Sequence, residues 1–459
     1  MGDIAHRYLP TGPVDRREML ERIGVGSIEE LFSTLPERVR LSEPPAVEGP
    51  YGDQDLRRYF DRLQSRNVTP GRDAASFLGA GAYRHDVPAA VDHLLHRSEF
   101  FTVYTPYQPE ISQGTLQAIF EFQTFISILT GLPVANASLY DGASAFAEGI
   151  LMADRLQRKR HKVVVSRGVH PQYRRTLRTY AQNLELEIVE VGWDAGGATD
   201  ADELAAAIDD DTICVAVQSP NYFGVIEGWA RAVEAARSAG ALVVGVVTEA
   251  LSMAVLQSPG SGGCDIAVGE AQSFGLPVGY GGPYLGFLAA RDNAKRAVPG
   301  RLVGETVDVE DRRAFVLTLA TREQHIRREK ATSNICTNQS LCALAATIYL
   351  ALHGQTGLRR LAEINLQRAA AARRRLRELE GVEAYFAAPS FNEFLLRTER
   401  DPAQIVAELA ERNVLAGVTV GRDYEELADG LLVAVTECNP PEEIDALVAG
   451  LADVAGGGS

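Results

Sequence analysis

The chain has 459 residues, of which 46% are hydrophobic, and its formal net charge is −16. This length exceeds what one compact core usually supports, so two domains with extensions are expected. The apolar content is that of an ordinary globular protein and is enough to bury a large core. The acidic balance disfavours a nucleic-acid or anionic-membrane surface and leaves neutral or basic partners open.

Cysteine usage and the N-terminus predict a soluble, cytoplasmic protein. The five cysteines are scattered without metal-type spacing, which predicts buried free thiols in a reducing compartment and no metal site. The first residues have no basic-then-apolar signal pattern. No continuous apolar run reaches the length of a membrane span.

Residues 1–50 are predicted to form an N-terminal helical arm of two short helices. Ser27 and Glu30 have the spacing of a capping box, and Gly24 is placed to end the preceding helix. A Pro- and Gly-rich segment ending at Pro50 then separates the arm from the rest of the chain. Arms of this kind often wrap a partner subunit.

Residues 51–330 are predicted to form a large domain. Amphipathic helices come first, one from Ser112 to Gly131 and one that begins after Asp141 and Gly142. Short β-branched runs then alternate with helical stretches, and the runs lie at residues 163–165, 188–191, 213–217 and 242–247. Continuous apolar strands joined by helices indicate a mostly parallel sheet covered on both faces.

Residues 331–459 are predicted to form a smaller α/β domain. Two helices are expected, from Gln339 to Leu352 and from Leu358 to Leu379, followed by strands at residues 382–386, 393–396 and 431–435. Further helices should begin at Pro402 and Pro441, because proline is favoured in the first turn of a helix.

Polar residues follow the predicted strands in an order that is typical of one known fold. Residues 141–144 (DGAS) open a helix whose N–H groups and Ser144 hydroxyl could hold a phosphate, although a plain N-cap turn explains them as well. His170 follows the first β-branched run, where it could stack on a pyridine ring or simply cap a helix. Asn221 lies in a Pro-Asn turn after a later strand. This order resembles the aspartate-aminotransferase fold, which is fold type I of the pyridoxal-phosphate enzymes.

The two positions with the most demanding chemistry in that fold are changed. Glu249 stands where an aspartate should meet the pyridine nitrogen, and its extra methylene makes the same contact unfavourable. Gln272 stands where the Schiff-base lysine is expected. An amide cannot form an imine, and the chain's four lysines all lie elsewhere, at Lys159, Lys162, Lys295 and Lys330. The pattern predicts a retained scaffold that has lost its own cofactor chemistry.

Four long motifs carry a more specific resemblance. They are residues 77–83 (FLGAGAY), 104–114 (YTPYQPEISQG), 136–142 (NASLYDG) and 321–337 (TREQHIRREKATSNICT). Over nearly its whole length the chain resembles the alpha subunit (subunit 1) of two-subunit glycine decarboxylases, the P-proteins of the glycine cleavage system. It also resembles the N-terminal half of the single-chain form.

The resemblance implies a fold of the aspartate-aminotransferase type with a mostly parallel seven-stranded sheet. It further implies that pyridoxal phosphate is bound covalently by a lysine-bearing beta subunit (subunit 2), in an α2β2 complex, rather than by this chain. The coenzyme would act as the electron sink while glycine loses CO2. The aminomethyl group would then pass to the lipoyl arm of the H-protein.

Two segments hold the candidates for residues that face the partner's cavity. Tyr104, Tyr107 and Glu110 lie in a loop of aromatic, amide and acidic groups, although the tyrosines could equally be interface packing groups. Arg322 and His325 belong to a basic cluster that could meet an oxyanion. An ion-paired crossing between domains, with Glu323 and Glu329 as counterions, is the alternative.

Two other functions stay open at this point. One is an independent pyridoxal-phosphate lyase or transferase that uses Lys295 or Lys330. The other is a catalytically silent scaffold or regulator derived from the same fold. A nucleotide-binding function is disfavoured, because the chain has no phosphate-binding loop of the G-x-x-x-x-G-K-[ST] type.

Overall fold

The computed structural model describes residues 10–41, 43, 45–101, 105–335 and 338–455. The chain divides into two compact units, Met1–Asn67 and Val68–Ser459, which are described separately. The boundaries predicted at residues 50 and 330 stay predictions.

The first unit consists of short helical elements. Gly24 ends α1 in the left-handed conformation (φ 89°), as predicted, and the Glu30 N–H donates to Ser27 Oγ (3.3 Å). The second predicted helix is a 3-10 turn, because Gly26 and Pro36 leave too few residues between them for a stable α-helix. The elements are α1 (Pro13–Ile23), η1 (Glu29–Phe32), η2 (Glu37–Val39) and α2 (Asp53–Gln64).

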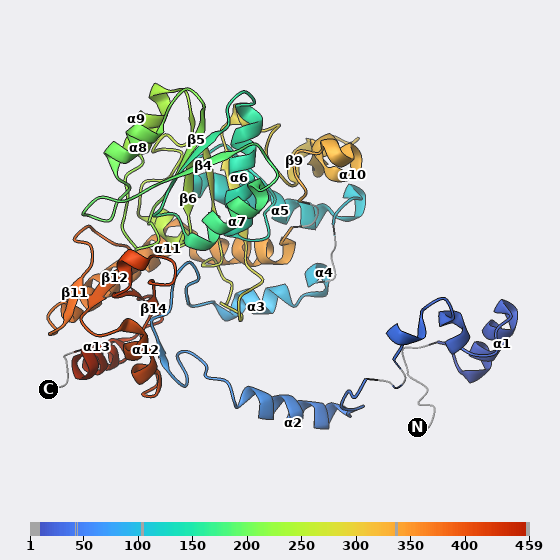
Figure 1. The fold of residues 1–459 in the computed structure, drawn as a ribbon. Helices are drawn as coiled ribbons and strands as arrows, with labels where there is room; N and C mark the ends of the chain where they lie inside the picture. Colours follow the sequence, from blue (N-terminus) through green and yellow to red (C-terminus); the bar gives the residue numbers. More distant parts are fainter. Residues whose placement is uncertain (1–9, 42, 44, 102–104, 336–337, 456–459) are drawn as a thin grey trace. The chain divides into compact units, whose positions relative to one another are not determined.

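A seven-stranded sheet lies at the centre of the second unit (Figure 1). Its strand order is β2-β8-β7-β6-β5-β3-β4; the neighbours from β7 to β4 pair in parallel, and β8 is antiparallel to both β7 and β2. The predicted, mostly parallel sheet is therefore confirmed. Its strands are β2 (Val134–Ala135), β3 (Lys162–Ser166), β4 (Glu187–Val191), β5 (Thr212–Gln218), β6 (Leu242–Val247), β7 (Ile266–Glu270) and β8 (Gly286–Ala290).

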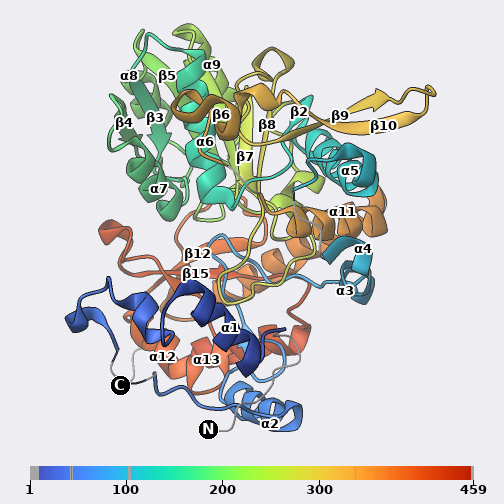
Figure 2. The same cartoon turned by 90° about the vertical axis from the view of Figure 1, so that its right-hand side faces the viewer.

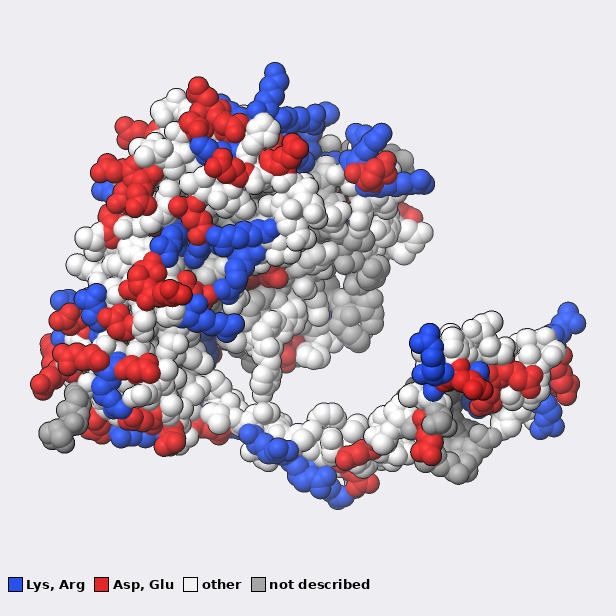
Figure 3. Space-filling view, in the orientation of Figure 1, with Lys and Arg blue, Asp and Glu red and all other residues white. Residues whose placement is uncertain are grey.

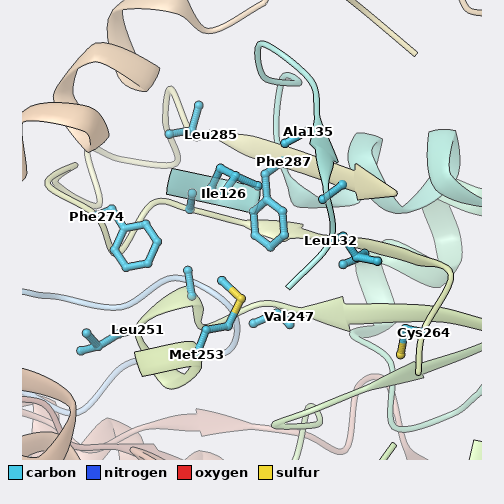
Figure 4. Packing of buried hydrophobic residues seen from close by; sticks show 14 of the residues in the cluster. Ile126, Leu132, Ala135, Val247, Leu251, Met253, Cys264, Phe274, Leu285 and Phe287 are labelled. Carbon is cyan, nitrogen blue, oxygen red and sulfur yellow. The ribbon is translucent and has the colours of Figure 1, made fainter. Parts of the chain in front are cut away.

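Helices cover both faces of this sheet, because successive residues of a buried strand point to opposite sides. Val163 and Val165 pack in one cluster with α6 and α7, whereas Val164 packs in another with α5, α9 and α11. Figure 4 shows part of the second cluster, where Phe274 and Phe287 lie near Met253. The helices are α5 (Gln113–Thr130), α6 (Gly142–Leu156), α7 (Pro171–Ala181), α8 (Ala201–Ala207), α9 (Ala230–Ser238) and α11 (Ser340–Leu376).

A four-stranded antiparallel sheet of order β11-β12-β15-β14 forms the core of the C-terminal part, with α12, α13 and the end of α11 packed on it. The three predicted strands and both proline-started helices are confirmed. One more pairing joins β1 to β13 in parallel, which brings the residues after Ser76 to the junction with the large sheet. The elements are β1 (Ala75–Ser76), β11 (Val382–Ala384), β12 (Glu393–Thr398), α12 (Pro402–Ala410), β13 (Val414–Leu415), β14 (Val418–Thr419), β15 (Gly430–Ala434) and α13 (Pro441–Ala455).

The helix α11 combines the two helices predicted on either side of Gly354, which has a non-helical conformation (φ 57°, ψ −176°). By length and composition alone, α11 is apolar enough to cross a membrane. Its buried residues, such as Tyr349 and Leu376, lie in the hydrophobic clusters beside the seven-stranded and four-stranded sheets. We therefore interpret α11 as a core helix that packs on both sheets.

A hairpin that the sequence did not predict projects from the large domain (Figure 2). It consists of β9 (Leu302–Val307) and β10 (Arg313–Thr318), and its base packs on α5. Figure 3 shows acidic and basic side chains interspersed over the face of the second unit in view. Many of the described charged side chains form ion pairs; Arg174 and Arg178, for example, both pair with Glu190.

Replacing Leu288 by alanine tests the importance of the large sheet. Leu288 is fully buried in β8, so we expect Leu288→Ala to lower the free energy of unfolding by ~2–5 kcal/mol. Leu352→Ala, at a leucine that is 50% exposed on α11, is the matched control and should have a much smaller effect. Chemical denaturation of the purified chain measures both, and equal losses would contradict the assigned burial.

Candidate functional site

The polar residues singled out in the sequence lie at one edge of the large sheet. Asp141 caps α6, His170 follows β3, Asn221 follows β5, Glu249 follows β6 and Gln272 follows β7. Because carboxyl ends of parallel strands meet at the same edge, the chain brings these residues together. This edge also contacts the C-terminal part of the chain, where Val225 forms an isolated antiparallel β-bridge with Ser390.

The N-terminus of α6 is occupied by carboxylates of the chain itself. Glu270 Oε2 accepts the Gly142 N–H (2.9 Å), and its Oε1 accepts the N–H groups of Gln272 (3.0 Å) and Leu285 (2.7 Å). Asp141 Oδ1 accepts the Ser144 N–H (2.7 Å), which is the plain N-cap arrangement. Burial raises the pKa of Glu270 to about 7, although these N–H donors oppose the shift. The helix end that could hold a phosphate is therefore already satisfied.

His170 is enclosed rather than open to a stacking ligand. Its Nε2 donates to the Ala80 carbonyl (2.8 Å), and its Nδ1 accepts the Gln172 N–H (3.1 Å). A Cβ placed on Gly81 would lie 2.8 Å from the imidazole, so the backbone of that segment covers the ring. Burial lowers the pKa of His170 to about 4, and the ring is neutral at ordinary pH.

The Asn221 amide supports its own turn. Its Nδ2 donates to the Gly197 carbonyl and to Glu227 Oε1, both at 2.7 Å. Its Oδ1 accepts the N–H groups of Phe223 (3.0 Å) and Val225 (3.1 Å). Both donors and both acceptor sites of the amide are used in these contacts, which leaves none for a cofactor.

Gln272 pairs with a peptide group in the buried interior. Its Oε1 accepts the Tyr83 N–H (3.0 Å), while its Nε2 donates to the carbonyls of Tyr83 (3.0 Å) and Leu276 (2.7 Å). The side chain therefore acts as donor and acceptor at once. A lysine ammonium carries donors only and could not accept the Tyr83 N–H.

Glu249 meets a histidine that the sequence analysis did not single out. Its Oε2 lies 3.1 Å from His85 Nε2 and accepts from Asn392 Nδ2 (2.9 Å), and His85 Nδ1 lies 2.9 Å from Glu437. Burial alone would lower the pKa of His85, but the two carboxylates raise it to about 10. Burial likewise opposes the shift of Glu437, whose pKa falls to about 2 because of His85 and nearby donors. His85 is therefore a charged imidazolium, and this cationic ring lies beside Glu249.

The segment of residues 79–85 fills the place where a cofactor would lie, and we call it the filling segment. Besides its contacts with His170, Gln272 and Glu249, it meets Glu393 on β12 through the Ala80 N–H (2.6 Å) and the Tyr83 hydroxyl (2.9 Å). The residues present do not fit pyridoxal phosphate, because a carboxylate holds the helix N-terminus and backbone covers His170. Within the described ranges, no group of three or more His, Cys, Asp or Glu residues could hold a metal ion.

Three of the other candidates, Tyr107, Arg322 and His325, lie around Arg301, a residue that the sequence did not single out. Tyr107 is 53% exposed and its hydroxyl accepts from Arg301 Nη2 (3.1 Å). His325 lies 3.6 Å from Glu323, which is 3.6 Å from Arg301 Nε, so Glu323 serves as the predicted local counterion. Arg322 donates to the carbonyls of Leu319 (3.1 Å) and Gly300 (2.9 Å). Glu110 is exposed in a 3-10 turn, and Tyr104 lies outside the described residues.

The chain matches the family model of the glycine cleavage system P-protein over residues 6–451. A relative from Moorella thermoacetica, named probable glycine dehydrogenase (decarboxylating) subunit 1, is 50% identical over 97% of this chain and 98% of its own length. A relative of the same name from Novosphingobium aromaticivorans is 50% identical over 98% of this chain and 99% of its own.

Solved structures agree with these relatives. A crystal structure of glycine decarboxylase (P-protein) of the glycine cleavage system, in inhibitor-bound form, has a TM-score of 0.89 and 44% identity, covering 98% of this chain and all of that one. The sphingosine-1-phosphate lyase of Burkholderia pseudomallei has a TM-score of 0.66 over 90% of this chain and 92% of its own, and its 14% identity shows the fold alone. The predicted aspartate-aminotransferase-type fold is confirmed.

Substituting His85 tests the buried charge network. His85→Gln leaves Glu249 and Glu437 without their cation, so the free energy of unfolding should fall by ~3–5 kcal/mol at neutral pH. Because folding raises the pKa of His85 from 6.5 to about 10, its contribution is complete below pH 6.5 and is lost as the pH rises through 10. Denaturation at several pH values should show the variant and the wild type converging above pH 10.

His96→Gln is the matched control for this substitution, because His96 is largely exposed and its ring pairs with the exposed Asp92 (3.5 Å). A difference between wild type and His85→Gln that does not shrink at high pH would contradict the charged state assigned to His85.

The substitution Gln272→Lys tests whether the filling segment blocks the position that a cofactor would occupy. We expect Gln272→Lys alone to bind no pyridoxal phosphate, because Glu270 still holds the α6 N-terminus and the filling segment stays in place. Borohydride treatment followed by mass spectrometry of the variant should find no coenzyme adduct. A stoichiometric adduct on Lys at position 272 would show that the space is available.

Proposed function

Because the chain belongs to the glycine cleavage system P-protein family, we propose that it is the subunit of a glycine decarboxylase that lacks the Schiff-base lysine. It acts only with a second, lysine-bearing subunit, two copies of each, in the cytoplasm. Glycine is the substrate, and the lipoyl arm of the H-protein receives the aminomethyl group. Neither nucleic acid nor membrane is a partner.

One observation carries this proposal: the position expected for the lysine holds Gln272, which is 1% exposed and bonded to the Tyr83 peptide. Pyridoxal phosphate, held by the second subunit, supplies the electron sink for loss of CO2. This chain contributes the surface around Tyr107 and His325. These side chains can bind or orient groups of the neighbouring subunit's site.

The lysines of this chain disfavour an independent pyridoxal-phosphate enzyme. Lys295 is half exposed and its Nζ pairs with Asp292 (3.1 Å), and Lys330 is exposed. Neither lysine is buried in an enclosed pocket of the kind that holds a Schiff-base lysine. The silent-scaffold alternative makes a different prediction, because the second subunit would then be fully active alone.

Reconstitution tests the proposal. This chain, the lysine-bearing subunit and an equimolar mixture are each supplied with pyridoxal phosphate, lipoylated H-protein and carboxyl-labelled glycine, and released CO2 is measured. Only the mixture should release label, since the site is complete only in the complex. Release by this chain alone would favour the independent enzyme, and equal release by the second subunit alone would favour the silent scaffold.

A further inference from the structure

Arg301 is a buried arginine, 5% exposed, that lies outside all four long motifs. Its guanidinium carbon is 5.4 Å from the centre of the Tyr107 ring, and its Nη2 donates to the Tyr107 hydroxyl. Its Nε has no hydrogen-bond partner among the described residues, and the Glu323 carboxylate is 3.6 Å away. One carboxylate therefore balances the charge while the guanidinium is held against the phenol.

Three of the four motifs meet at this arginine. Tyr107 belongs to residues 104–114, and the motifs at 136–142 and 321–337 fix the backbone around Arg301. Three hydrogen bonds do this: Asn136 Nδ2 to the Pro299 carbonyl (3.2 Å), the Ala137 N–H to the Arg301 carbonyl (2.9 Å) and Arg322 Nη2 to the Gly300 carbonyl (2.9 Å). The guanidinium therefore extends from a backbone that is held from two directions.

A purely structural role explains this arrangement poorly. Burying a guanidinium costs free energy that an apolar residue of similar volume would avoid. The half-exposed Tyr107 hydroxyl could also be satisfied by water without a buried donor. Arg301 and Glu323 instead hold two exposed side chains side by side. These are Tyr107 and His325, whose ring centres are 6.0 Å apart.

We propose that Arg301 is a positioning residue for the reaction of the complex. It orients the Tyr107 hydroxyl and, through Glu323, His325, at the surface that faces the lysine-bearing subunit. This inference rests on the proposed function.

The chemistry of the pair defines the group that it would meet. Because Arg301 donates to the Tyr107 oxygen, the phenol keeps its own proton to donate to another atom. Beside it, the His325 ring can donate as well. Two neighbouring donors backed by a guanidinium suit a carboxylate or phosphate oxygen, which glycine and the coenzyme each carry.

The test uses the assembled complex of both subunits with Arg301→Lys, Tyr107→Phe and the double variant. Arg301→Lys keeps the charge but loses the planar fork, and Tyr107→Phe loses only the hydroxyl. Each should lower kcat/KM for glycine about tenfold. The double variant should lose no more than about twofold beyond either single one, because the two groups act as a unit.

Two further readouts identify the oxyanion. A raised KM for glycine with unchanged affinity for pyridoxal phosphate indicates the glycine carboxylate, and weakened coenzyme affinity indicates the phosphate. Arg313→Lys is the matched control, since Arg313 also lies over an aromatic ring (Phe315, 5.0 Å) and pairs with Glu305 (2.7 Å) but is exposed. Its kcat/KM should equal that of the wild type.

Full kcat/KM in Arg301→Lys and Tyr107→Phe, with an active wild-type complex, would overturn this inference alone. So would losses that match the loss of intact complex, seen by size-exclusion chromatography and thermal unfolding, because they indicate a structural role. An inactive wild-type complex would overturn the proposed function and this inference with it.

Discussion

A histidine held between two buried carboxylates is the interaction on which the rest of this structure depends. Glu249 comes from the end of a strand in the large sheet, and Glu437 follows the last strand of the small domain. His85 joins them from the filling segment. In a low-dielectric interior each of these charges would be costly alone, so the three groups require one another and fix both domains around residues 79–85.

The same requirement explains the rest of the filled site. Loss of a cofactor alone would leave three groups without hydrogen-bond partners. They are the N-terminus of α6, the carboxylate after β6 and the polar side chain after β7. Glu270, His85 and Gln272 provide carboxyl oxygens, a cationic ring and an amide at those places. The scaffold of the cofactor-binding fold is thus kept by substitutes for the chemical groups that a cofactor would have supplied.

Sequence periodicity predicted the sheet well, because β3, β5 and β6 are continuous apolar runs bounded by helices. It failed for β9 and β10, whose largely exposed residues leave only a weak pattern, and for the turn at Glu29–Phe32. The helix α2 was missed although Leu56, Phe60 and Leu63 recur at helical spacing. The absence of the Schiff-base lysine could be predicted from a single residue, Gln272. His85 and Arg301 could not be identified in this way, because each has a partner more than 160 positions away, Glu249 for His85 and Tyr107 for Arg301. A His in a polar loop and an Arg before a strand carry no local signal of burial.

We propose that the reactive amine belongs to another polypeptide. Borohydride reduction of the assembled, active complex, followed by mass spectrometry of its peptides, locates the coenzyme. We expect the phosphopyridoxyl group on a lysine of the second subunit and all peptides of this chain to be unmodified. A stoichiometric adduct on Lys159, Lys162, Lys295 or Lys330 would contradict it.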